Sequence, residues 1–120
     1  MDPTLQERAE MKTLADVMNW AGVKDTKGKM WRSKCLEVFG AEEGDHWKSL
    51  GVLPQSTFDD ALEGVKLEID GQSVAAPVVI QGQMGSVGRT CRIKAGLQPS
   101  QQEEKAQAQA RANTNRFAEA

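Results

Sequence analysis

A glycine set between two apolar residues recurs along the chain, and this pattern constrains the fold more than any other feature. It occurs where apolar helical stripes end, at Ala21-Gly22-Val23, Phe39-Gly40-Ala41, Leu50-Gly51-Val52 and Ala95-Gly96-Leu97. A left-handed glycine commonly ends a helix, and the apolar residue after it folds back on the last turn. Because the same arrangement appears at four places, the pattern predicts a domain of several short helices.

Apolar residues at helical spacing indicate where these helices lie. Thr13 and Asp16 have the spacing of an N-cap and an N3 residue, so a helix is expected to follow Thr13. Its apolar stripe at i, i+3, i+4 and i+7 is Leu14, Val17, Met18 and Ala21. A second stripe predicts a helix over about residues 29–39, with a buried face of Trp31, Cys35, Leu36, Val38 and Phe39. The segment after Pro3 favours a further short helix.

The stretch from residue 45 to residue 67 contains the clearest helix start. Ser56 is placed to cap a helix, with Asp59 at N3 near the positive end of the helix dipole. The apolar stripe that follows is Phe58, Ala61, Leu62 and Val65. Upstream of Pro54, Asp45 is expected to cap a short helix that ends at Gly51.

Residues 65–97 support two interpretations. Alternating apolar residues on either side of Asp70-Gly71 are typical of a β-hairpin. A helix that begins near Pro77 explains the stripe of Ile80, Met84, Val87, Cys91 and Ala95. Gly82, Gly85 and Gly88 weaken that helix by about 1 kcal/mol each, although on one face they would let another helix approach closely. The helix is favoured over the hairpin.

The length of 120 residues allows one domain and no second independent core. We therefore predict an all-α fold, a small bundle of four to five short helices within residues 1–97. The alternative is an α+β fold with a hairpin around Asp70-Gly71. Residues 98–120 form a polar, Gln/Ala-rich extension that we expect to be a frayed helix or disordered.

Two bulk features concern the cellular setting. The N-terminal residues contain no apolar signal-peptide core, and no stretch approaches the ~18 apolar residues of a membrane span. Cys35 and Cys91 lie far apart on apolar stripes, which favours buried thiols over a disulfide framework. We expect an intracellular protein that does not cross a membrane, and the sequence leaves the compartment and the oligomeric state open.

Charge is distributed unevenly, which suggests that segments pair with one another or with partners. The net charge is −2, but residues 41–70 contain eight acidic and two basic residues, a local charge of −6. Residues 24–34 form a basic segment that is the sharpest candidate binding surface, made of Lys24, Lys27, Lys29, Trp31, Arg32 and Lys34. Its cations could contact phosphates, and Trp31 could stack on a base.

No motif in the sequence is specific for catalysis, a metal or a cofactor. His46 is the only histidine, and no ligand spacing accompanies it. The glycines of residues 82–88 lack both the Walker ending and the dinucleotide spacing. We therefore expect a non-enzymatic protein without a cofactor or a metal.

Protein–protein interaction is the function that the sequence favours, as an adaptor or a small subunit of a larger assembly. Opposite charges on residues 24–34 and 41–70 would suit such a role. Trp20 and Trp47 are the candidate interface anchors, because tryptophan is enriched at binding hot spots. The alternative function is nucleic-acid binding through the basic segment, although the pI of about 5.4 is low for that class.

Overall fold

The computed structural model describes residues 2–100, 103–106 and 108. Its elements follow the order α1 (Leu5–Glu10), α2 (Leu14–Ala21), α3 (Trp31–Phe39), α4 (Lys48–Gly51), α5 (Gln55–Glu63), β1 (Lys66–Ile69), β2 (Gln72–Ala75) and α6 (Val78–Lys94). The predicted helical fold is confirmed. Within residues 2–100 there are six helices, more than the four or five expected, and a small antiparallel hairpin accompanies them.

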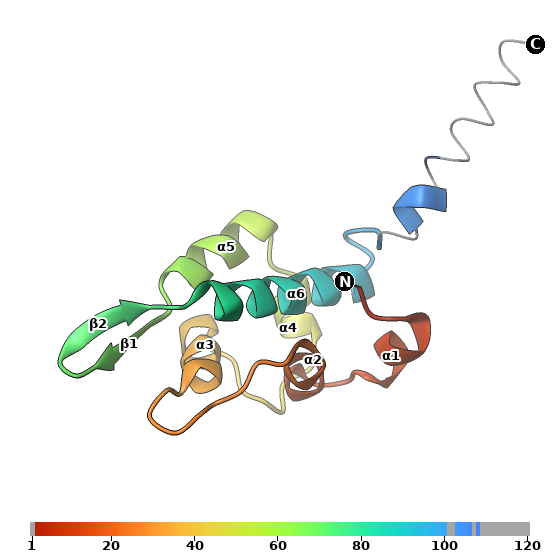
Figure 1. Cartoon of the computed structure of the whole chain (residues 1–120). Coiled ribbons are helices and arrows are strands. Elements are labelled where there is room, and N and C mark those ends of the chain that lie inside the picture. Colours follow the sequence, from red (N-terminus) through yellow and green to blue (C-terminus); the bar gives the residue numbers. More distant parts are fainter. Residues whose placement is uncertain (1, 101–102, 107, 109–120) are drawn as a thin grey trace, which may run out of the picture.

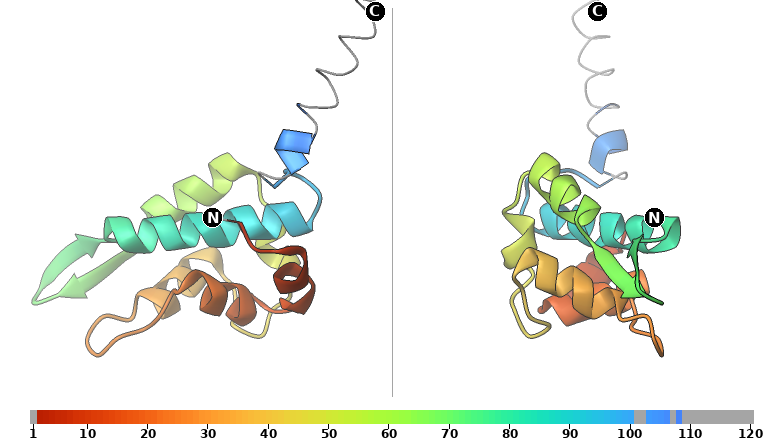
Figure 2. Two further views of the ribbon diagram at one scale, coloured as in Figure 1. Left: turned by 45° about the vertical axis from the view of Figure 1, so that its right-hand side comes forward. Right: turned by 90° about the vertical axis from the view of Figure 1, so that its left-hand side faces the viewer.

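Helix α6 is the element on which the rest of the domain is assembled. It runs through the middle of the molecule and contacts α2, α4 and α5 (Figure 1). The hairpin precedes its N-terminal end, while residues 95–100 continue from its C-terminal end, so the two lie at opposite ends of α6 (Figure 2). The core therefore forms along the side of α6 that faces the shorter helices.

Three of the four helix ends that were predicted to have a left-handed glycine are confirmed. Gly22, Gly40 and Gly96 all have positive φ, at 84°, 63° and 74°. After each, the next amide donates to the carbonyl five residues back, from Val23 to Met18, Ala41 to Leu36 and Leu97 to Arg92. These are Schellman bonds, which satisfy carbonyls that a helix end leaves free.

The fourth helix, α4, ends at Gly51 as predicted, but the left-handed glycine expected there is wrong. Gly51 is the buried last residue of α4 and does not have positive φ. A Cβ there would lie 2.8 Å from the carbonyl oxygen of Cys91. Gly51 is thus required by the close approach of α4 to α6, which a pattern of neighbouring residues could not reveal.

Two predicted caps are also wrong, and one is confirmed. Thr13 Oγ1 accepts from the Asp16 amide at 3.3 Å, and Asp16 Oδ2 accepts from the Thr13 amide at 3.0 Å. Ser56 lies inside α5, whose N-cap is Pro54, because the fixed φ of proline suits that position and its carbonyl accepts from Phe58. Asp45 does not cap α4; its side chain accepts from the Glu42 amide at 2.8 Å.

The two interpretations of residues 65–97 each hold for part of the segment. Strands β1 and β2 pair from Lys66↔Ala75 to Ile69↔Gln72, and the connecting Asp70 and Gly71 both have positive φ, as a type I′ turn requires. Helix α6 then begins after Pro77 and runs unbroken through Gly82, Gly85 and Gly88. A short hairpin therefore precedes the long helix.

Phe58 lies at the centre of the packing between α5 and α6. It is 1% exposed, and its ring stacks on Phe39 with centroids 4.8 Å apart. A Cβ at Gly88 would lie only 2.7 Å from that ring. The predicted role of the helix glycines in close packing is therefore confirmed at Gly88, whereas a Cβ at Gly82 or Gly85 would meet no atom within 4 Å.

Both cysteines are free and buried, as the sequence indicated. Burial raises the pKa of the Cys35 thiol to about 11 and that of Cys91 to about 12. The thiolate, which is the reactive form, is therefore strongly disfavoured at neutral pH. These side chains act as small apolar groups of the core.

Thr13→Ala and Ser56→Ala test which helix start depends on a side-chain cap. The loss of the Thr13 cap is expected to lower the free energy of unfolding by about 1 kcal/mol. Ser56→Ala is expected to stay within about 0.5 kcal/mol of the parent, because Ser56 is exposed and makes no cap bond. Urea unfolding followed by circular dichroism measures both. A larger loss for Ser56→Ala than for Thr13→Ala would contradict the observed helix starts.

Candidate functional site

The basic segment predicted as a binding surface is divided by the fold. Trp31 is 5% exposed and packs in the core, so its ring is not available to stack on a base. Arg32 Nε lies 2.7 Å from Glu43 Oε1, and Lys34 Nζ lies 3.4 Å from Glu37 Oε1. Lys24, Lys27 and Lys29 remain exposed and make no ion pair within the described part of the chain. The segment therefore keeps three free cations and no exposed ring.

The Arg32–Glu43 pair joins the basic segment to the acidic one. Arg32 Nη1 also donates to Asn19 Oδ1 at 2.6 Å and to the Val23 carbonyl at 3.3 Å. The arginine thus connects α3 with α2 and with the loop that follows it. Part of the uneven charge along the sequence is therefore neutralised by ion pairs within the domain, as expected if charged segments pair with one another.

The two candidate tryptophan anchors are half-buried and already engaged. Trp20 Nε1 donates to Glu7 Oε2 at 3.0 Å. The ring of Trp47 has Lys94 Nζ 4.9 Å and Lys48 Nζ 5.9 Å from its centroid. Cations stabilise such a ring through its negative face. Both side chains therefore have internal roles, and only their exposed edges face solvent.

Trp20 borders a pocket of about 270 Å³ in which two of the three acids, Glu7 and Asp16, have internal roles. It is lined by Glu7, Glu10, Met11, Asp16, Asn19 and Trp20. Hydrogen bonds from the backbone amide of Thr4 lower the pKa of Glu7, and those of Lys12 and Thr13 lower the pKa of Asp16. These carboxylates are helix caps, which accounts for their position without a ligand.

His46 has a local structural position. It is exposed, its Nδ1 accepts from the Lys48 amide at 3.2 Å, and its ring lies 5.0 Å from that of Trp47. No group of three His, Cys, Asp or Glu side chains that could hold a metal ion occurs among residues 2–100, 103–106 and 108. Over the same residues, none of the helices is both long and apolar enough to cross a membrane.

An open groove lies between α5 and α6. Its volume is about 530 Å³, and it is lined by Asp59, Leu62, Glu63, Val78, Gln81, Gly82 and Gly85. We call it the α5–α6 groove. Gly82 and Gly85 leave open space where other residues would place a Cβ. The groove therefore has a low floor on α6 and an acidic wall on α5.

Apolar side chains at the start of α6 stand beside this groove without cover. Val78 is 83% exposed and Val79 is 67% exposed. Two adjacent exposed valines on a helix are unusual unless another molecule covers them, since each exposed apolar side chain forgoes part of the hydrophobic stabilisation. Of the two, Val78 is part of the groove lining, and Val79 follows it in the first turn of α6.

The acidic wall of the groove consists of Asp59 and Glu63, which are four residues apart on α5. Like charges at this spacing repel by a few tenths of a kcal/mol. Both side chains are exposed, and neither makes an ion pair within the described residues. A cation placed at the groove would relieve this repulsion.

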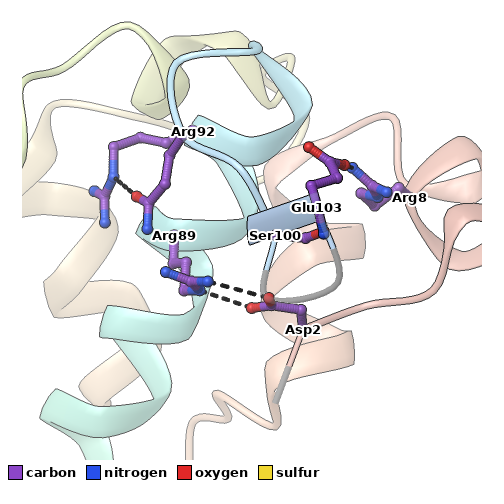
Figure 3. A network of polar contacts seen from close by, with 7 residues as sticks. Asp2, Arg8, Arg89, Arg92, Ser100 and Glu103 are labelled. Atoms are coloured by element: carbon purple, nitrogen blue, oxygen red, sulfur yellow. Dashed lines mark hydrogen bonds and ion pairs between the residues drawn. The ribbon is translucent and has the colours of Figure 1, made fainter. Parts of the chain in front are cut away.

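Polar contacts hold Asp2 and the start of the C-terminal extension against the domain. Asp2 faces the guanidinium of Arg89, with oxygen–nitrogen distances of 2.7 and 3.1 Å (Figure 3). Arg8 pairs with Glu103 at 3.2 Å, and Ser100 Oγ accepts from the Glu103 amide at 3.2 Å. The start of the predicted extension is thus bound to α1. The rest of the extension, residues 101–102, 107 and 109–120, lies outside the described residues.

The sequence indicated the parts of the groove but not the groove itself. Gly82 and Gly85 stood out in the sequence as packing glycines, and Asp59 stood out as a residue of a helix start. Their juxtaposition depends on how α5 folds back along α6, which no local pattern specifies. Comparison with protein-family models, with curated proteins and with solved structures found no match for the chain.

Proposed function

We propose that the protein is a non-enzymatic interaction module that binds an amphipathic helix of another protein in the α5–α6 groove. The observation that carries the proposal is the low glycine floor of the groove beside the exposed Val78. Helix-in-groove recognition uses apolar anchors at helical spacing on the bound segment. The role is that of an adaptor or of a small subunit in a larger assembly.

The size of the groove fits a helical ligand. From Val78 to Gly85 the floor spans about 10 Å, which is two helical turns. Packed helices normally lie about 8–10 Å apart, and glycine on one of them permits the shorter distances. A helix in the groove would cover Val78, Leu62 and the open space above Gly82 and Gly85.

The charge of the groove specifies the partner further. Asp59 and Glu63 favour a helix that carries lysine or arginine beside its apolar face. Complementary charge of this kind contributes mainly to the association rate and to specificity. Nucleic acid is disfavoured at the groove because its wall is acidic.

Peptide selection tests the proposal on the full chain. A display library of random peptides about 15 residues long, enough for four helical turns, is selected on the wild-type protein. The enriched peptides are expected to be helical, with apolar residues at i, i+3 or i+4 and adjacent lysine or arginine. Gly85→Trp is expected to weaken their binding at least about tenfold, because the ring fills the space of a buried apolar anchor worth about 1.5–3 kcal/mol.

Gly44→Trp is the matched control. Gly44 is exposed, has no atom within 4 Å of a built Cβ and lies in the acidic turn rather than in the groove. Selected peptides are expected to bind this variant as they bind wild type. Selection without any enriched peptide, or equal affinity for Gly85→Trp and wild type, would overturn the proposal.

A further inference from the structure

Arg92 of α6 is a buried cation with an unused hydrogen-bond donor. The residue is 8% exposed, its Nε donates to Gln98 Oε1 at 3.0 Å, and its Nη1 is buried without a partner. Its guanidinium carbon lies 5.8 Å from the centroid of the Phe58 ring. Arg89, one turn earlier, differs in that it holds Asp2 through two hydrogen bonds (Figure 3).

Such a group is costly to bury unless a carboxylate accompanies it. Taking a cation out of water is unfavourable, and a buried donor without a partner adds to that cost. The loss of solvent around Arg92 lowers its pKa, although arginine stays protonated at neutral pH. Asp59 is near enough to act on Arg92 electrostatically but makes no ion pair with it within the described residues.

Arg92 lines a pocket that is otherwise mainly apolar. The pocket has a volume of about 410 Å³ and lies between the α4–α5 connection and the loop after α6. Its walls include Val52, Leu53, Pro54, Leu97 and Pro99. Val52 is 64% exposed and Leu97 is 65% exposed. We call this hollow the Arg92 pocket.

The Arg92 pocket and the α5–α6 groove lie along the same pair of helices. On α6, Gln81 and Gly85 border the groove and Arg92 borders the pocket, at spacings of four and seven residues, so these three share one helical face. Gly88, between them, is covered by the Phe58 ring. On α5, Gln55 borders the pocket while Asp59 and Leu62 border the groove, again at spacings of four and three. From Gly85 to Arg92 the distance along the axis is about 10 Å.

We propose that the Arg92 pocket binds an aspartate or glutamate carboxylate of the helix that occupies the α5–α6 groove, two to three turns from its basic residues. The inference rests on the proposed function and adds the direction in which the bound helix runs. Acidic side chains of this protein meet the basic end of the ligand, and Arg92 meets its acidic end. Charge-assisted hydrogen bonds to a guanidinium are strong and directional, so this contact would fix the register and direction of the bound helix.

The test combines a peptide selected on wild type with its variant in which that acidic residue is replaced by the amide. On the wild-type protein, the amide peptide is expected to bind about tenfold or more weakly, since a hydrogen bond to a charged group is worth about 1.5–3 kcal/mol. On Arg92→Gln, the two peptides are expected to bind equally. Because the two peptides are compared on the same protein, a lower stability of Arg92→Gln affects both affinities equally and leaves their ratio unchanged.

Arg92→Lys provides a second variant if Arg92→Gln does not fold. It is expected to retain a smaller preference for the acidic peptide, because lysine keeps the charge but not the forked donor geometry. Equal affinity of both peptides for wild type, or the same preference on wild type and Arg92→Gln, would overturn the inference. If the selected peptides still lose their binding to Gly85→Trp, an overturned inference about Arg92 would leave the proposed function intact. Peptides that bind Gly85→Trp unchanged would remove the proposed function itself.

Discussion

Phe58→Ala is expected to lower the free energy of unfolding by about 3–5 kcal/mol. The ring is 1% exposed and makes three separate contacts, with the Phe39 ring, with the backbone at Gly88 and with the Arg92 guanidinium. Its removal leaves a cavity that the two helices cannot close, and it exposes a buried cation to an empty space. Urea unfolding monitored by circular dichroism gives the change.

Leu5→Ala is the control for this deletion of an apolar side chain. Leu5 is 74% exposed, so its truncation is expected to change the free energy of unfolding by no more than about 0.5 kcal/mol. If Phe58→Ala lowers the free energy of unfolding by less than about 1 kcal/mol, the described packing of α5 against α6 around Phe58 would be contradicted.

Gly88→Ala and Gly82→Ala are expected to change stability in opposite directions. At Gly88 the new Cβ would lie 2.7–2.9 Å from three atoms of the Phe58 ring. That ring is held against Phe39 and has little freedom to move, so overpacking is expected to cost about 1–3 kcal/mol. At Gly82 the Cβ meets no atom within 4 Å, and the better helix propensity of alanine is expected to stabilise by about 0.5–1 kcal/mol.

Thermal and urea unfolding of the two variants decide this prediction directly. Both substitutions are glycine to alanine in the same helix, so their intrinsic helix propensities cancel in the comparison. A Gly88→Ala protein as stable as Gly82→Ala would show that α5 does not approach α6 as closely as described. A Phe58→Leu change introduced together with Gly88→Ala is expected to recover part of the loss.

Features defined by neighbouring residues could be predicted from the sequence. The Thr13–Asp16 cap, the three left-handed glycines and the Asp70-Gly71 turn each depend on a few consecutive residues. Their physical causes, which are hydrogen bonds to free amides and permitted backbone angles, are therefore visible in the sequence itself. The helical fold class followed from the same local signals.

Features that depend on packing between distant segments could not be predicted. Gly51 resembled the other glycine ends, but it is required by the carbonyl of Cys91, forty residues away in the chain. Arg92 lies in the last turn of α6, where cations are common, and its burial depends on the distant Phe58 and on Gln98. The mistaken Ser56 cap has another cause, since Pro54 begins the helix earlier through its own backbone.

The candidate site also combines features that are visible in the sequence with features that only the fold creates. The basic segment was visible as charge, but the fold buries Trp31 and pairs Arg32 with Glu43. The surface that the structure leaves open lies instead along α5 and α6. Exposed valines, a glycine floor and separated charges of opposite sign occur there together.

Amide chemical shifts of the full-length, ¹⁵N-labelled protein test the central proposal most directly. On addition of a peptide selected on wild type, we expect the largest shifts in residues 59–63 and 78–85, a further change at Arg92, and little change in residues 24–34. Largest shifts in residues 24–34, with residues 59–63 and 78–85 unmoved, would contradict helix binding in the α5–α6 groove.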